Sequence, residues 1–294
     1  MLRVFKLFVL LAGLNFLATP VWGQEYKFNG FVSWKYDNHN SNKHKGVPLQ
    51  HAWLIGNKKM SENWDVTVIV APYGPPRVLH DLRFQWLKPK PFVERIALGR
   101  FQPPVGRELA DVRVDRLSTI AYSSMADSMV VRDDGVKVDL KFGKFLMSIA
   151  GFLGNRVGGF KEEIENGCPD FYFRTRILLG KNLQIGWSYR LKHKDHRLWS
   201  AEASRKTSKT LLAFETTGYN FGKRWYGLGE LQFFKKLRAA LRYENLESFN
   251  GSGRRHRWIL GAVMYLPHDN EVRLNRIHDL YGRKIYSVQA ILRW

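Results

Sequence analysis

The side chains best suited to chemistry in this sequence are arginines and lysines that alternate with apolar residues. In the segment 237–243, Arg238 and Arg242 stand between alanine, leucine and tyrosine residues. A guanidinium group presents a rigid fork of N–H donors that suits phosphate and carboxylate groups. The pattern therefore predicts anion binding. For any single arginine the alternative is an ion pair with a neighbouring acid, which would stabilise the protein without contacting a solute.

Basic residues at such positions, or in the long segment 102–132, form the candidate anion-binding set. They are Arg83, Arg95, Arg107, Arg113, Arg116, Lys137, Lys141, Arg174, Arg176, Arg190, Arg238, Arg242 and Arg273, with Arg293 at an equivalent position near the C-terminus. Acids share the same positions: Asp65, Asp81, Asp139, Glu202, Glu230, Glu244 and Glu271. The whole chain carries 47 Lys and Arg against 26 Asp and Glu. A field of this sign attracts anions.

Catalytic and metal-binding patterns are weak by comparison. His193 and His196 have a spacing that suits a metal, but they lie in the polar run KHKDH, which is typical of a solvated turn. Ser200 and Ser204 have no histidine beside them, and Cys168 is a lone thiol. Glycine-rich phosphate loops and G-x-S-x-G motifs do not occur. We therefore expect no enzymatic activity and no cofactor.

Segments with a two-residue period must position the charged side chains. In 183–191 the odd-numbered residues are apolar or aromatic, and polar residues or glycine stand between them. In 136–142 the even-numbered residues are apolar and the odd-numbered ones charged. Successive residues of a strand point to opposite faces of a sheet. We expect sixteen strands: 26–36, 47–57, 63–71, 78–88, 92–101, 134–142, 145–155, 170–179, 182–192, 197–207, 208–220, 223–234, 236–246, 255–266, 270–280 and 284–294.

Most of these segments are close to the roughly 9–11 residues of a tilted membrane-spanning strand. A lysine or arginine facing lipid at mid-bilayer would cost about 2–4 kcal/mol, so the charged face must line the interior of a barrel. Arg276 departs from the pattern, since alternation from Val272 and Leu274 places it outside. We expect a bulge there, or a position near the lipid headgroups.

Connection lengths favour a transmembrane barrel. Bacterial outer-membrane barrels have short periplasmic turns and longer external loops. Connections 37–45, 156–169 and 247–254 are long and polar, whereas 143–144 and 180–181, of opposite parity, are tight. Ten Trp and twelve Tyr suit aromatic girdles at the membrane interfaces. A soluble β-sandwich is the alternative fold. A nucleic-acid-binding protein would share the charge but would have little use for the tryptophans, so we expect no nucleic-acid partner.

The N-terminus indicates export. Arg3 and Lys6 precede an apolar run, Leu7 to Leu17, which is far shorter than the roughly 20 residues of a spanning helix. Compact residues follow at the two positions that a signal peptidase reads. We expect residues 1–23 to be a signal peptide and 24–294 to form one outer-membrane barrel domain.

The longest break in the strand pattern runs from about Gln102 to Arg132 and is, by parity, the third external loop. A loop of this length without its own strand pattern is usually functional. If it folds inward, it narrows the channel. The alternative is a loop that lies over the mouth of the barrel.

Two segments carry a family resemblance. The run 98–108, LGRFQPPVGRE, resembles the G-x-F-x-x-P-F-G segment of the phosphate-selective porin O and P family, where it likewise ends a strand and opens the third loop. Residues 134–155 look like the next hairpin of that family. The resemblance implies an outer-membrane porin that assembles as a homotrimer.

The sequence thus predicts a porin that lets small anions, phosphate or other oxyanions among them, diffuse through a cationic lumen narrowed by the third loop. Expected partners are outer-membrane lipids and small anionic solutes. Trp294 ends an alternating segment and resembles the C-terminal signal read by the barrel-assembly machinery. Two other functions remain open: a non-conducting barrel that serves as a scaffold or partner sheath, and a barrel enzyme that acts on lipids.

Overall fold

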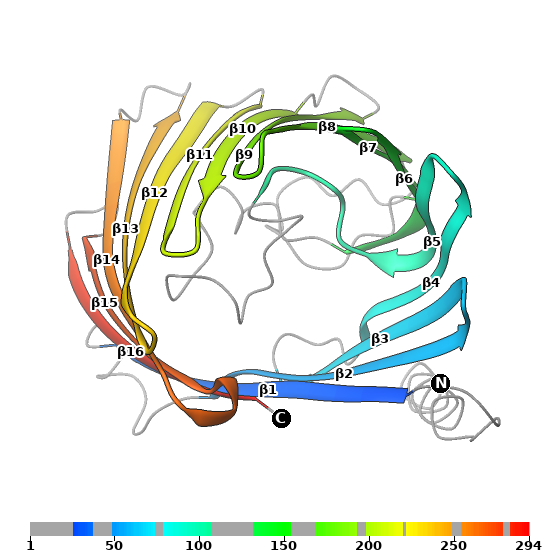
Figure 1. Cartoon of the computed structure of the whole chain (residues 1–294). Helices are drawn as coiled ribbons and strands as arrows, with labels where there is room; N and C mark the ends of the chain where they lie inside the picture. The colour runs from blue at the N-terminus through cyan, green and yellow to red at the C-terminus, as the bar shows by residue number, and fades with distance from the viewer. Residues whose placement is uncertain are drawn as a thin grey trace, which may run out of the picture.

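Sixteen antiparallel strands close into a barrel in the computed structural model (Figure 1). The structure describes residues 26–37, 49–73, 79–107, 132–153, 169–192, 198–219, 222–248, 254–278 and 283–293. The strands are β1 (Tyr26–Asp37), β2 (Leu49–Ser61), β3 (Trp64–Tyr73), β4 (Leu79–Lys90), β5 (Val93–Phe101), β6 (Asp133–Phe142), β7 (Phe145–Phe152), β8 (Asp170–Leu179), β9 (Leu183–Lys192), β10 (Leu198–Lys206), β11 (Thr210–Tyr219), β12 (Gly222–Phe234), β13 (Leu237–Ser248), β14 (Arg254–Tyr265), β15 (Glu271–His278) and β16 (Lys284–Arg293). A 3-10 turn, η2 (Pro267–Asp269), joins β14 to β15.

Each strand pairs with its neighbours in sequence, and β1 pairs with β16 to close the sheet. The predicted fold class, strand number and strand order are confirmed, with boundaries that differ by a few residues. Closure leaves no unpaired edge, so every strand finds backbone partners on both sides. The signal peptide predicted for 1–23 lies outside the described residues, as do Trp294, Cys168, His193 and His196.

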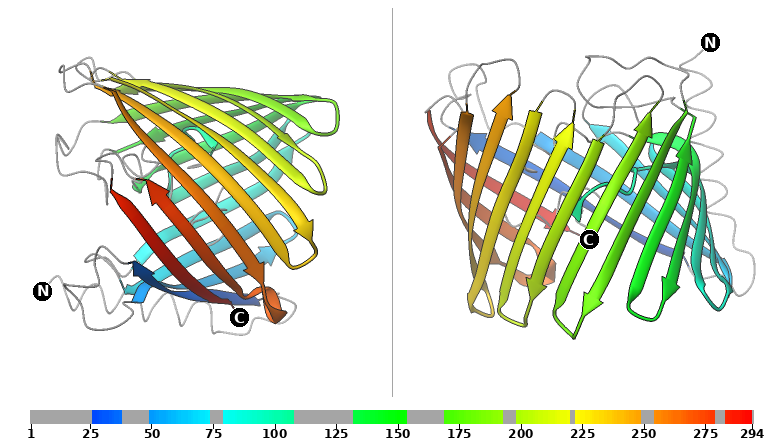
Figure 2. Two further views of the ribbon diagram at one scale, coloured as in Figure 1. Left: turned by 90° about the vertical axis from the view of Figure 1, so that its left-hand side faces the viewer. Right: turned by 90° about the horizontal axis from the view of Figure 1, so that it is seen from above.

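Short turns lie together at one end of the barrel, here termed the short-turn end (Figure 2). Gly143 and Gly180 occupy the turns after β6 and β8 with φ of 58° and 67°. Such angles carry little steric cost only in glycine, which explains how these connections remain tight. The opposite end, where the longer connections lie, is the loop end.

The outer face of the barrel is apolar. Leu54, Ile185, Leu212 and Leu260 are each between 43 and 58% exposed, on strands spread around the wall. An exposed apolar surface that surrounds a whole barrel requires an apolar environment. In the described part of the chain no helix is both long and apolar enough to cross a membrane.

The inner face is less polar than alternation predicts. Phe31, Trp53, Ile55, Ile69 and Ile291 form a buried cluster on β1, β2, β3 and β16. The rings of Phe31 and Trp53 lie 5.3 Å apart between centroids. Alternation alone predicts that the apolar residues of a strand face lipid. These strands instead carry apolar residues on both faces, because part of the interior is a packed core.

Arg276 lies on the outer face of β15, with its guanidinium 5.8 Å from the ring centroid of Tyr286. The pairing of β15 with β14 and β16 runs without a register shift. The predicted bulge is therefore wrong. Arg276 lies two residues from His278, the last residue of β15, at the loop end of the strand.

Candidate pore and constriction site

The segment after β5 leaves the wall and enters the barrel (Figure 1). Pro103, Pro104, Val105 and Gly106 are buried. The backbone N–H of Gly106 donates to Oγ of Ser188 on β9, at 3.0 Å. A segment that starts on β5 thus reaches strands on another part of the inner wall. For the described residues 102–107, the predicted inward course of the third loop is what the structure shows.

Glu215 on β11 anchors this segment, which we call the constriction segment (residues 102–107). Its Oε2 accepts hydrogen bonds from the backbone N–H of Arg107 at 3.1 Å and from the hydroxyl of Tyr226 at 3.0 Å. Its Oε1 accepts one from Ser200 at 3.0 Å. The residue is only 1% exposed. A buried carboxylate needs such donors, since hydrogen bonds to a charged acceptor are the strong ones.

Gly106 is required by both conformation and space. Its φ is +63°, in the left-handed region. A Cβ at this position would lie 1.8 Å from Oε1 of Glu215. Only glycine therefore brings the backbone close enough for the neighbouring N–H groups to reach Glu215 and Ser188.

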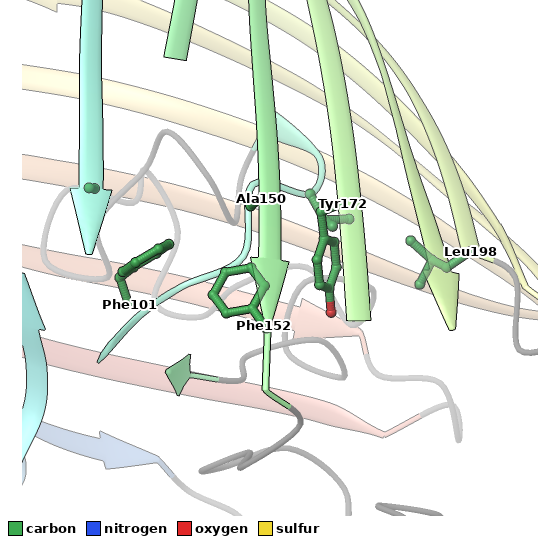
Figure 3. Packing of buried hydrophobic residues seen from close by; sticks show 7 residues of the cluster. Phe101, Ala150, Phe152, Tyr172 and Leu198 are labelled. Atoms are coloured by element: carbon green, nitrogen blue, oxygen red, sulfur yellow. The ribbon is translucent and has the colours of Figure 1, made fainter. Parts of the chain in front are cut away.

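Apolar side chains of the wall also pack against the constriction segment. Val105 belongs to a buried cluster with Phe101, Phe152, Tyr172 and Leu198, completed by two alanines (Figure 3). Phe152 makes edge contacts with Phe101 and Tyr172, at 5.1 and 5.3 Å between ring centroids. The residues that surround Val105 in this cluster lie on β5, β7, β8 and β10. The constriction segment therefore packs against this part of the wall.

Charged residues line the wall between β4 and β7. Asp139 accepts hydrogen bonds from Nε of Arg95 at 2.7 Å and from Oγ of Ser148 at 2.7 Å. Nζ of Lys137 lies 3.2 Å from the same carboxylate. Arg95 also donates to Gln85 at 3.0 Å. One acid therefore faces two cations, which leaves this group with a net positive charge.

Asp81 on β4 repeats this arrangement. Nε of Arg132 lies 2.8 Å from one carboxylate oxygen, and Nε of Arg83 lies 3.9 Å from the other. Arg132 was absent from the predicted set, which took only Arg107, Arg113 and Arg116 from the long segment 102–132; it is the last residue of that segment and immediately precedes β6. Its guanidinium also lies 5.8 Å from the ring centroid of Trp53. An arginine directly before the aspartates that open β6 is the signal that could have identified it.

The wall formed by β13 to β16 holds two further groups of this kind. Glu244 lies 2.8 Å from Nη2 of Arg257 and 3.8 Å from Nη1 of Arg242. Glu271 pairs with Arg273 and, at 2.9 Å, with Nη2 of Arg293. Around Asp81, Asp139, Glu244 and Glu271, each carboxylate is shared by at least two cations. We call these four groups the shared-carboxylate sites.

Other predicted cations pair with different acids. These pairs are Arg174 with Glu202 at 2.6 Å, Arg190 with Asp170 at 3.0 Å, Arg238 with Glu230 at 3.2 Å, and Lys141 with Glu94 at 3.5 Å. Arg176 is half-buried on the inner face of β8. The structural alternative for individual arginines, ion pairing along the wall, therefore applies widely. Arg113 and Arg116 lie outside the described residues.

Exposure separates these cations. The side chains of Arg95, Arg238 and Arg83 are 34, 32 and 26% exposed, whereas those of Arg174, Arg242 and Arg273 are at most 3% exposed. A solute can contact only a side chain that reaches water. Only the first three are exposed enough to contact a solute, whereas the buried three could influence one through their electric field alone. A role in transport stays a prediction for all of them.

The serines considered for catalysis lie inside the barrel. Ser200 is fully buried and bonded to Glu215, and Ser204 occupies the same face of β10. A lipid-acting enzyme needs its nucleophile on the outer face, where neither serine lies. Within the described ranges, His, Cys, Asp and Glu form no group of three or more that could hold a metal ion.

Solved structures share this architecture. OmpT of Vibrio cholerae, an outer membrane protein solved in a trimer form, superposes with a TM-score of 0.59 and 10% identity over 92% of this chain and 99% of that one. A mutant of the porin of Rh. blastica gives a TM-score of 0.61 and 9% identity, over 92% and 100% of the two chains. At these identities the likeness concerns the fold. This barrel therefore has the fold of outer-membrane porins. No protein-family profile and no curated protein matches the sequence.

Proposed function

We propose that this protein is an outer-membrane porin through which small anions diffuse passively. The observation that carries the proposal is the set of shared-carboxylate sites. Each of these four acids is contacted by at least two cations, which supports a wall whose charge stays positive after its ion pairs are formed. Fixed positive charge along a pore lowers the barrier to anion entry and raises it for cations.

The constriction segment would bring a passing solute close to these fixed positive charges. Residues 102–107 lie within the barrel and reduce its free cross-section. Arg95 lies on β5, the strand from which this segment starts, and Lys137 lies on the neighbouring strand β6. A narrow passage brings a solute within a few ångströms of the fixed charges. At that distance screening by salt is incomplete, since the Debye length is about 8 Å at physiological ionic strength.

Phosphate or another oxyanion is the proposed solute class. Arginine binds such groups through two parallel N–H donors. Arg83, Arg95 and Arg238 are partly exposed on the inner face. The segment 98–108 resembles the phosphate-selective porins, and it contains Gly106, which lies against Glu215.

The proposed location follows from the outer face and the N-terminus. The apolar exterior suits a bilayer, and the signal-peptide pattern of residues 1–23 suits export to the outer membrane. The homotrimer implied by the resemblance, and recognition of Trp294 by the barrel-assembly machinery, are parts of the same proposal. A trimer form is recorded for OmpT of Vibrio cholerae.

A non-conducting barrel is the second candidate. Arg242, Arg273, Phe31 and Ile291, all on the inner face, are each 1% exposed, so the interior beside β1 and β13 to β16 is filled. A barrel filled across its whole section would serve as a scaffold or a sheath for a partner. Conductance decides between the two functions.

The test is single-channel recording of the refolded protein in a planar bilayer under a KCl gradient, followed by titration of phosphate. We expect discrete conductance steps, a reversal potential that reports chloride preference, and block by phosphate at low concentration. Chloride preference without phosphate block would retain the anion pore and remove phosphate as its solute. Potassium preference would overturn the anion proposal. Absence of conductance from correctly folded barrels would leave the scaffold.

A further inference from the structure

An apolar groove crosses the outer face of the barrel over β10 to β14, strands that lie side by side in this wall (Figure 2). Its volume is about 510 Å³. Leu212 and Phe214 of β11 form one side, and Leu241 and Tyr243 of β13 form the other. Leu212, Phe214 and Leu241 are 46 to 58% exposed, as expected of residues that face lipid.

Two glycines of β12 form the floor of this groove. Gly227 pairs in register with Phe214 and Tyr243, and Gly229 with Leu212 and Leu241. A Cβ on Gly227 would meet nothing within 4 Å, and one on Gly229 would make only an ordinary contact, at 3.7 Å from Leu212. Neither glycine is required by a positive φ or by a close backbone approach. Their effect is to leave a depression where the other residues of this face project into the bilayer.

The groove ends in a basic side chain. Arg205 is the penultimate residue of β10, so it lies at the short-turn end of the barrel. It lines the groove and is exposed beside Leu183 and Leu212, its partners in register. Over the described part of the chain, no carboxylate contacts this guanidinium, whereas the cations of the inner wall are paired. The guanidinium of Arg205 therefore lies at the edge of an apolar surface.

Aromatic rings close the other side. Tyr243 and Trp258 both line the groove, with ring centroids 4.2 Å apart. Trp225 packs against Tyr243 at 5.1 Å. Rings therefore make this side of the groove rigid. A linear hydrocarbon fits this combination of small residues on the floor and rings on the walls.

We propose that the groove binds one glycerophospholipid, with an acyl chain over Gly227 and Gly229 and its phosphate on Arg205. The short-turn end faces the periplasm in an outer-membrane barrel, which places Arg205 at the leaflet that contains phospholipids. Arginine near an interface extends its guanidinium to the headgroups while its stem covers apolar surface. The site requires the barrel to lie in a membrane, as proposed above, but not that its pore conducts.

The test is native mass spectrometry of the refolded, delipidated full chain in a neutral detergent, with dioleoyl phosphatidylglycerol titrated in. Two variants probe the site: Arg205→Gln removes the phosphate contact, and Gly227→Leu fills the groove from a position where an added Cβ meets nothing within 4 Å. Two variants are controls on the outer face: Arg276→Gln and Ala290→Leu, on β15 and β16. Heat-modifiable migration on gels verifies that each variant is folded.

We expect the wild-type protein and both controls to retain one lipid per chain. Arg205→Gln should weaken binding about fivefold, because one basic residue near an anionic headgroup contributes about 1 kcal/mol. Gly227→Leu should weaken it at least as much. Dioleoylglycerol, which lacks the phosphate, should bind the wild type and Arg205→Gln equally.

Three results would overturn the proposal. The wild type could retain no lipid, or the two site variants could bind it as well as the controls do. Gly227→Leu could instead dissociate an oligomer into single chains, which would make the groove a contact between copies of this protein. Channel recordings on the same samples are independent of these outcomes, so failure of the lipid site and failure of the pore are distinguishable.

Discussion

The backbone N–H of Arg107 donates a hydrogen bond of 3.1 Å to Oε2 of Glu215, a residue 108 positions later in the chain. Arg107 follows β5, and Glu215 lies on β11, six strands further along the sheet. This contact, with the hydrogen bond from Gly106 to Ser188, ties the constriction segment to the wall. The carboxylate is otherwise engaged by Ser200 and Tyr226, so the anchor is part of a small buried network.

Removal of the anchor should destabilise the barrel. In Glu215→Ala the donors of Ser200, Tyr226 and Arg107 lose their acceptor, and each buried group left without a partner costs about 1–3 kcal/mol. We expect a lower free energy of unfolding in urea, measured on barrels folded in lipid vesicles, together with higher or noisier single-channel conductance. Glu62→Ala, in the exposed turn after β2, is the matched control. Equal stability of the two variants would contradict the anchor.

Gly106→Ala tests the close approach of the constriction segment to Glu215. The alanine would carry both the strain of φ +63° and a Cβ 1.8 Å from Oε1 of Glu215. Gly143→Ala is matched, since Gly143 has φ +58° and no atom within 4 Å of its Cβ position. Both variants should lose about 1 kcal/mol or more of stability from backbone strain.

Only Gly106→Ala should also alter conductance, because only there does the new methyl group displace the constriction segment. Recordings of the two variants under identical conditions make the comparison. The same conductance change in both variants would show that backbone strain, and not contact with Glu215, is responsible.

Ion selectivity should follow the charge of the shared-carboxylate site around Asp139. Arg95→Gln removes one of its two cations and should lower the permeability ratio of chloride to potassium, while Asp139→Asn should raise it. A unit charge 4 Å from an ion contributes about 1 kcal/mol in water, with opposite sign for chloride and for potassium, so each ratio should change by a factor of up to about 30. Reversal potentials in a KCl gradient measure it. Shifts of the same sign in both variants would rule out a field effect.

Selectivity should also weaken as salt rises. The Debye length falls from about 10 Å at 0.1 M to about 3 Å at 1 M, so fixed charges on the wall lose reach across the lumen. At a constant ratio of concentrations across the bilayer, the reversal potential should move toward zero between these two salt levels. A salt-independent value would indicate that ions contact the arginines directly at the narrowest point.

Particular residues show how far the sequence could predict the site. Arg83, Arg95, Lys137 and Arg238 were found by parity alone, because a strand that faces lipid on one side must place its charges on the other. Arg132 was missed because it lies at the boundary between the long segment 102–132 and β6, where neither the loop nor the alternation marks it as lining the interior. The partners of these cations could not be predicted, since register between strands determines which carboxylate each one meets.

Sixteen strands, their order and the charged face of most strands could be predicted from the sequence, because two-residue alternation and turn residues are local signals. Three relationships are visible in the folded barrel alone: Gly106 meets Glu215, Phe31 and Ile291 share a core inside the barrel, and Gly227 forms the floor of a groove on the outer face. These relationships join positions on different strands. They depend on register, on closure of the sheet and on the path of the chain across its interior, which no local pattern encodes.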